Sequence, residues 1–271
     1  MSKLEELKKL RDKLELEIKG KDNFPKDHPC VIISNHNRLM DIFYLPMAFD
    51  DDIVSIVSAR LTYKQDPHRL HFVNKYLNAF PIEAHGGKSY SHLCINQISS
   101  FLDEDISISI WPEGAYIDDT EHVYKGRTGA ARILFNTMSK GNYAYFLPVS
   151  INIKTDDDLD NYVPNDKDKV SINICEPILP DEYYYSFINS DNKQDMNQVL
   201  HNITEEGMKQ IASSLNREYV DEYIELFPKG NIIFSNGETV DKKEAQKQEY
   251  INRYQHDLKR LSLSLIRDIK K

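Results

Sequence analysis

The residues with the clearest chemical pattern in this sequence are His36 and Asp41, five positions apart in Asn-His-Asn-Arg-Leu-Met-Asp. A neutral imidazole can accept a proton near pH 7, because its unperturbed pKa is roughly 6.5. A carboxylate beside it can hold the other ring nitrogen and fix the tautomer. The pair therefore predicts a general base with its orienting carboxylate. Taken alone, the same residues also fit a polar turn that caps a helix.

A carboxylate and two cations form a second group of candidate residues. Glu113 follows an alternating Ile-Ser-Ile-Ser-Ile run, in the turn Trp-Pro-Glu-Gly, while Lys125 and Arg127 precede a predicted helix in a glycine-containing segment. Helix N-termini and nearby cations favour phosphate or carboxylate groups. The Lys125 segment is therefore a candidate anion-binding site. Taken alone, Glu113 fits the cap of a turn or helix.

Apolar, β-branched runs alternate along the chain with segments of helical periodicity. The predicted strands are 31–35, 53–59, 79–84, 106–111, 143–153 and 169–175, and the predicted helices are 40–49, 68–77, 89–102 and 127–139. This alternation predicts an α/β fold with a mostly parallel central sheet and helices on both faces. His36 and Glu113 would each follow a strand, where ligands bind in such sheets. Residues 180–194 are expected to form a loop.

Composition excludes several classes of protein. The chain of 271 residues has a net charge of -9, so it lacks the basic surface of nucleic-acid-binding proteins. Its three cysteines are far apart, which fits a reducing compartment and argues against a structural zinc site. P-loop, GxGxxG and GxSxG motifs are missing. We expect no metal and no cofactor, in a protein that is cytoplasmic or attached peripherally to the inner face of a membrane.

The two ends of the chain differ from its middle in charge and pattern. Residues 1–21 carry a net charge of +2 and residues 242–271 carry +5, which leaves -16 for the segment between them. The expected parts are an N-terminal amphipathic helix in 1–21, an α/β domain in 22–185, and a C-terminal helical extension in 186–271 with a hairpin near 232–240. The hairpin would turn on Asn-Gly in a type I′ conformation.

The terminal helices are both amphipathic, and each leaves alternatives open. The apolar stripe of the first fits packing on the domain or lying on a membrane surface. That of the basic C-terminal helix fits packing on the body or on a partner chain, or contact with anionic lipid or an acidic carrier protein.

Four short blocks together resemble the glycerolipid acyltransferase family, which includes 1-acylglycerol-3-phosphate and other lysophospholipid acyltransferases. The blocks are Asn35-His36 with Asp41, Phe80-Pro81-Ile82-Glu83, Trp111-Pro112-Glu113-Gly114 and Leu147-Pro148-Val149, with a Lys-Gly segment at 125–132 after the third. They follow the family's order and spacing over residues 31–150. Four weak motifs in register make a specific signal. The resemblance implies that His36 is catalytic and that Asp41 supports it.

The sequence departs from the family pattern mainly where the family uses arginine. Ala84 stands where the second block usually ends in arginine, and Ala115-Tyr116 replaces the Thr-Arg that usually follows the third. Arg38 stands where a serine is usual. Alanine and tyrosine do not replace an arginine that grips phosphate. Either the acceptor carries no phosphate there, or another cation binds it, from among Arg38, Lys88, Lys125 and Arg127.

The resemblance implies an acyltransferase that moves a fatty acyl group from acyl-coenzyme A or acyl carrier protein to a hydroxyl acceptor. His36 would take the hydroxyl proton as the oxygen attacks the thioester, and Asp41 would orient the imidazole. The expected acceptor-binding residues are Glu113, Gly114, Arg38, Lys125 and Arg127. The alternatives are an acceptor that is not a glycerolipid, a thioester hydrolase, and a non-catalytic lipid-binding or membrane-docking module.

Overall fold

The computed structural model of the chain describes residues 2–59, 67–83, 88–116, 119–154, 164, 168–224, 231–241 and 244–271. Its strands are β1 (Glu15–Lys19), β2 (Cys30–Ser34), β3 (Val54–Ser58), β4 (Asn78–Ile82), β5 (Ile108–Ile110), β6 (His122–Tyr124), β7 (Tyr145–Lys154), β8 (Lys169–Ile174), β9 (Glu218–Val220), β10 (Ile232–Ile233) and β11 (Thr239–Val240). Its α-helices are α1 (Lys3–Arg11), α2 (Asp41–Tyr44), α4 (Pro67–Tyr76), α5 (Lys88–Leu102), α6 (Gly129–Met138), α7 (Asp181–Ile188), α8 (Lys193–Leu215) and α9 (Gln248–Ile269). The described residues also form the 3₁₀ turns η1 (Lys21–Asn23), η2 (Leu45–Ala48) and η3 (Glu244–Gln246).

Within the described residues, a central sheet of seven strands runs in the order β1-β8-β7-β2-β5-β3-β4. Every neighbouring pair is parallel except β7 and β8. The mostly parallel α/β sheet predicted from the sequence is therefore confirmed. The helix predicted over 40–49 is shorter than expected, because α2 gives way to η2, which has Pro46 in its first turn.

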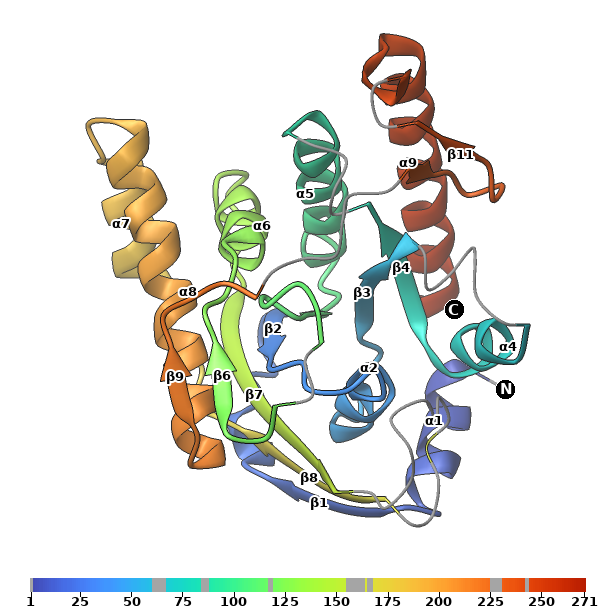
Figure 1. Cartoon of the computed structure of the whole chain (residues 1–271), viewed down its shortest axis with the longest axis vertical. Helices are drawn as coiled ribbons and strands as arrows, with labels where there is room; N and C mark the ends of the chain where they lie inside the picture. Colours follow the sequence, from blue (N-terminus) through green and yellow to red (C-terminus); the bar gives the residue numbers. More distant parts are fainter. Residues whose placement is uncertain are drawn as a thin grey trace.

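β2 lies in the middle of the sheet, and its side chains enter two hydrophobic cores. Val31 and Ile33 pack in the core beneath α5, α6, α8 and α9. Cys30 and Ile32 pack in the core beneath α1, α2 and α4. Figure 1 shows these two groups of helices on opposite faces of the sheet. A strand covered on both faces needs an uninterrupted apolar run, which Cys-Val-Ile-Ile supplies.

Helix α8 approaches β2 very closely at Gly207. A Cβ atom added there would lie 2.5 Å from Cδ1 of Ile33 and 3.2 Å from Cε1 of Phe146. Glycine therefore lets the helix backbone rest directly on β2 and β7. The C-terminal half of the chain is in this way seated on the strand that leads to His36.

The predicted N-terminal helix is correct only in its first half. α1 ends at Arg11, and Glu15–Lys19 forms the strand β1, which pairs in parallel with β8. In β1, the half-buried Leu16 and Ile18 alternate with exposed charged residues, and this alternation is typical of a strand with one packed face. The prediction of helix for residues 15–18 is therefore wrong.

The predicted loop over 180–194 is also wrong, because α7 and the start of α8 lie there. Pro180 precedes α7, and Asp181 and Glu182 occupy its first turn. Acidic residues in this position favour a helix N-terminus. Tyr184 and Phe187 pack against the core, which supplies the burial that holds the helix.

β10 and β11 form the antiparallel hairpin predicted near 232–240, but its turn differs from the prediction. The amide of Gly237 donates to the carbonyl of Phe234 at 2.9 Å. Gly237 has a positive φ of 81°, whereas Asn236 does not. A type I′ turn needs positive φ at both central residues, so the loop is instead a three-residue connection with Gly237 in the left-handed region.

Apolar side chains of both terminal helices pack against the body of the protein. Leu7 of α1 is 5% exposed, and Tyr254 and Leu258 of α9 are 4% and 1% exposed. These side chains are thus unavailable to a lipid surface. Membrane contact through other residues and the division into three parts stay predictions. In the portion of the chain described here, no helix has the length and apolar character to cross a bilayer.

Candidate active site

The two main predicted motifs meet because they follow neighbouring parallel strands. β2 and β5 pair with Ile33 opposite Ile110. His36 and Glu113 each come three residues after these partners, so both turns leave the same edge of the sheet at the same level. The backbone amide of His36 donates to Oε2 of Glu113 at 2.6 Å. The Asn-His and Trp-Pro-Glu-Gly turns therefore form one site.

His36 and Asp41 form the predicted histidine–carboxylate pair. Nδ1 of His36 lies 3.1 Å from Oδ2 of Asp41, and the two side chains are 12% and 2% exposed. The same Oδ2 accepts a hydrogen bond from the backbone amide of Arg38 at 2.9 Å, which fixes the carboxylate. Among the described residues, Nε2 of His36 has no hydrogen-bond partner. The ring can therefore offer Nε2 to a substrate while Nδ1 faces Asp41.

Glu113 is a buried carboxylate that accepts two backbone amides. Besides the bond to His36, Oε1 accepts from the amide of Tyr124 at 3.0 Å, and the residue is 1% exposed. Burial raises the pKa of Glu113 to about 7, although both amide bonds act in the opposite direction. These contacts make Glu113 a support for the backbone of the His36 turn. Direct contact with the acceptor stays a prediction.

Aromatic side chains flank the imidazole of His36. The ring centroids of Trp111 and Tyr116 lie 5.4 and 5.8 Å from that of His36. Tyr116 is 45% exposed, so it borders the approach to the ring. The turn between them closes through a hydrogen bond from the amide of Gly114 to the carbonyl of Trp111 at 3.1 Å. Gly114 has a φ of 82°, a conformation that strains other residues. Contact of Gly114 with the acceptor stays a prediction.

Asn35 and Asn37 fasten the turn to distant segments. The side-chain amide of Asn35 pairs with both backbone groups of Ile151, at 2.9 Å each, and so continues the β2–β7 ladder after β2 has ended. Its nitrogen also donates to Oδ1 of Asn37 at 2.6 Å, and Nδ2 of Asn37 donates to the carbonyl of Asp119. The position of His36 is therefore fixed by both of its neighbours in the sequence.

Lys125 and Arg127, which are predicted to bind an anion, contact the segment that follows β9. Nζ of Lys125 lies 2.7 Å from Oδ1 of Asp221, and Nη2 of Arg127 donates to the carbonyl of Ile224 at 3.0 Å. Both cations also lie against the ring of Tyr223. Their charged groups thus hold the segment that follows β9, and anion binding by either stays a prediction.

Arg38 and Lys88 are the remaining candidate cations. Arg38 is half-buried in the His36 turn, and its backbone is engaged with Asp41. The side chain of Lys88, as well as Ala84, lies outside the described residues. Acceptor binding by Arg38 therefore stays a prediction.

Two neighbours of the site were missed at the level of sequence. Arg217 donates to Oδ1 of Asn37, and Asp119 holds His122 and Tyr124, both through Oδ2 at 2.8 Å. A search for His–Asp pairs at a spacing of three would have found the second group. Arg217 carries no local signal, because Asn37 is 180 positions away.

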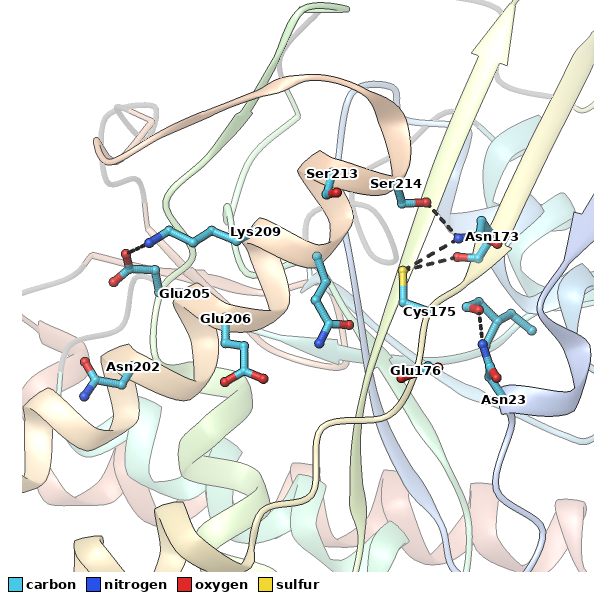
Figure 2. A pocket seen from close by; sticks show the side chains of 12 residues that line it. Asn23, Asn173, Cys175, Glu176, Asn202, Glu205, Glu206, Lys209, Ser213 and Ser214 are labelled. Carbon is cyan, nitrogen blue, oxygen red and sulfur yellow. Dashed lines mark hydrogen bonds and ion pairs between the residues drawn. The ribbon is translucent and has the colours of Figure 1, made fainter.

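A groove of about 920 Å³ lies between α8 and β8, and its lining does not include His36, Asp41 or Glu113. Figure 2 shows polar side chains that line it, among them Glu205, Glu206 and Lys209 of α8, Asn173 of β8 and Cys175 just after that strand. Pockets for apolar ligands are lined mainly by apolar and aromatic side chains, so this lining is unlike a channel for an acyl chain. Within the described ranges, no cluster of His, Cys, Asp and Glu could hold a metal ion.

A model of the acyltransferase family matches residues 15–152, more than half of the chain. The chain belongs to the acyltransferase family. The matched region contains His36, Asp41 and Glu113, so the resemblance seen in the four blocks is confirmed at the level of the family. The acyltransferase region ends within β7, and Arg217 lies outside it.

Among solved structures, the chain is similar to the 1-acyl-sn-glycerophosphate (LPA) acyltransferase PlsC from Thermotoga maritima. The identity is 20% and the TM-score is 0.46, over 78% of this chain and 80% of that chain. No curated protein sequence matches this one. Assignment to the acyltransferase family therefore rests on the family model.

Proposed function

We propose that the protein transfers a fatty acyl group from a thioester to a hydroxyl acceptor, with His36 as general base and Asp41 as its orienting carboxylate. The observation that carries this proposal is the imidazole itself, whose Nδ1 faces Asp41 at 3.1 Å while Nε2 has no partner among the described residues. A histidine held in this way accepts a proton through Nε2. Membership of the acyltransferase family supports an acyl group as the unit transferred.

In the proposed reaction, Nε2 of His36 takes the proton of the acceptor hydroxyl as its oxygen bonds to the thioester carbonyl carbon. The tetrahedral intermediate then breaks its C–S bond, and the departing sulfur recovers a proton from the imidazolium. A thiol has a pKa of roughly 8.5, so the leaving group needs little protonation. General-base catalysis of this kind contributes roughly a hundredfold to ten-thousandfold in rate. No acyl-enzyme intermediate is required.

The substrates that we propose are acyl-coenzyme A or acyl carrier protein as donor and a lysophospholipid or glycerol phosphate as acceptor. The family blocks around His36 support this acceptor class. The engagement of Lys125 and Arg127 with Asp221 and Ile224 favours the alternative, an acceptor without phosphate at that position. Since the thioester donor and a lysophospholipid both carry an acyl chain, we propose that the protein works from the cytoplasm at the inner face of a membrane.

Release of free thiol from palmitoyl-coenzyme A tests the proposal, with lysophospholipids, glycerol 3-phosphate and a fatty alcohol offered as acceptors. The wild type should release thiol, and His36→Ala should lower the rate by roughly a thousandfold. His122→Ala is the matched control, because it removes another histidine paired with aspartate and should change the rate by less than about threefold. Equal rates in wild type and His36→Ala would contradict the general-base role.

Analysis of the lipid products separates transfer from its alternatives. A transferase forms acylated acceptor and consumes little thioester without one. A hydrolase releases fatty acid whether or not an acceptor is present. If the wild type and His36→Ala both bind lipid vesicles and neither consumes thioester, the protein is a non-catalytic module and the proposed function is overturned.

A further inference from the structure

Arg217 reaches the His36 turn from the C-terminal part of the chain. It donates from Nη1 to Oδ1 of Asn37 at 2.7 Å and from Nη2 to Oδ1 of Asn152 at 3.0 Å. Asn37 follows His36 directly, and Asn152 belongs to β7, the strand beside β2. One planar guanidinium therefore ties the turn to the sheet through two nitrogens at a fixed separation.

The backbone of Arg217 is held on both sides. Asn216 ends α8 in the left-handed region with a φ of 53°, and the amide of Arg217 donates to the carbonyl of Ala212 at 2.9 Å. Directly after Arg217, β9 pairs in parallel with β6. A side chain on so constrained a backbone loses less conformational freedom when it forms its two hydrogen bonds.

The charge of Arg217 faces an acidic site. Asp41 and Glu113 are each 1% exposed, and Asp119 lies beside Asn37. Burial lowers the pKa of Arg217, whereas these three carboxylates favour its charged form. Both of its hydrogen bonds go to neutral amides, and within the described residues no direct ion pair cancels its charge.

We propose that Arg217 is a positioning residue for the acyl transfer described above, which holds the His36 turn against β7 and offsets the charge of the carboxylates around it. It acts through Asn37 and needs no contact with substrate. The kinetic part of this inference rests on the proposed function, whereas the positioning of the turn can be measured without it.

The first arm of the test is kinetic and uses full-length protein with palmitoyl-coenzyme A and the best acceptor of the panel. Arg217→Met should lower kcat by roughly tenfold to a hundredfold, because small misplacements of a catalytic group have effects of this size, while KM changes little. Arg217→Lys keeps the charge but cannot span both asparagines, so its kcat should lie between that of the wild type and that of Arg217→Met. Arg267→Met, at an exposed arginine of α9, is the matched control and should match the wild type.

The pH–rate profile separates charge from packing. Removing a cation that faces Asp41, Glu113 and Asp119 favours protonation of the site. The acid limb of the profile should therefore move to higher pH in Arg217→Met but stay in place in Arg217→Lys. A residue that served only the stability of the fold would not shift this limb.

The second arm is amide hydrogen exchange and needs no substrate. In Arg217→Met, exchange across residues 35–41 should accelerate by roughly tenfold while the amides of β2 stay protected, because only the turn has lost its tether. Unchanged exchange in this segment together with unchanged kcat would overturn the inference. So would acceleration spread evenly through α8, β9 and β2, which would mark general destabilisation. A wild type that exchanges as expected but never consumes thioester would instead defeat the proposed function alone.

Discussion

Two of the histidine–aspartate pairs in the described residues, His36 with Asp41 and His122 with Asp119, differ in whether the second ring nitrogen faces another group. In the pair of His36 and Asp41, the ring bonds to its carboxylate through Nδ1, and Nε2 has no partner within the described residues. In the pair of His122 and Asp119, the Nδ1–Oδ2 distance is shorter, at 2.8 Å, but Nε2 lies 3.9 Å from Oε2 of Glu218. Both nitrogens of His122 therefore face carboxylates.

The pair of His122 and Asp119 is less suited to accept a proton. The hydrogen bond to Asp119 raises the pKa of His122, and a protonated imidazole cannot accept a proton. Although burial opposes the change, hydrogen bonds from Glu121, Tyr124 and His122 lower the pKa of Asp119 to about 2. The comparison teaches that a short distance between histidine and aspartate does not identify a general base. A general base also needs a ring nitrogen that can reach the substrate.

The largest expected difference between the pairs lies in their aspartates. Asp41→Asn should lower kcat by roughly a hundredfold to ten-thousandfold, because an amide can donate to Nδ1 and favour the wrong tautomer of His36. Asp119→Asn should cost about 1–3 kcal/mol of stability, since its carboxylate serves several donors, with less than about a tenfold loss of kcat. Steady-state kinetics and urea unfolding of both variants measure the contrast. Equal kinetic losses would remove the distinction between the pairs.

Glu113 lies between the two pairs, because its carboxylate accepts the amide of His36 and that of Tyr124, whose hydroxyl donates to Asp119. Its pKa in the folded protein is about 7, above the unfolded value of roughly 4.5, so between these values the folded state holds a proton that the unfolded state has lost. Stability should therefore fall as pH rises through this window. Between pH 5 and 8, the wild type should lose on the order of 3 kcal/mol relative to Glu113→Gln. Urea unfolding at each pH measures the difference, and parallel curves would show that Glu113 does not titrate here.

The smallest expected effect belongs to His122. Its raised pKa means that its contribution to stability is full below the unfolded pKa and is lost as pH rises through the folded pKa. His122→Gln should therefore be slightly less stable than the wild type at pH 5 and equal to it at pH 9. The change in kcat should stay within about twofold. Thermal unfolding at the two pH values tests this, and a deficit confined to pH 9 would reverse the assigned sign.

The sequence predicts the centre of the fold well because burial there leaves a local mark. Val31, Ile32 and Ile33 form an apolar run of the kind that only a doubly covered strand needs. A helix is wrongly predicted where the strand Glu15–Lys19 lies, because Leu10, Leu14 and Ile18 also fit a helical spacing. Its partner β8 begins at Lys169, and pairing over that separation leaves no trace in local periodicity.

The sequence predicts the residues at the centre of the candidate site, but not the residues that hold them in place. His36, Asp41 and Glu113 belong to short motifs, and the motifs meet because parallel strands bring their ends together. The contact of Lys125 with Asp221 and that of Arg217 with Asn37 join segments far apart in the chain. Such contacts depend on how whole elements pack, which neither spacing nor composition encodes.

The absence of a side chain at Gly207 decides how far α8 stands from the sheet. Because a Cβ there would lie 2.5 Å from Cδ1 of Ile33, alanine would force either the Ile33 side chain or the helix to shift. Arg217 lies just beyond the end of α8. An outward shift of the helix would therefore move Arg217, and with it Asn37 and the neighbouring imidazole of His36. The position of the His36 imidazole would then depend on a residue that has no side chain of its own.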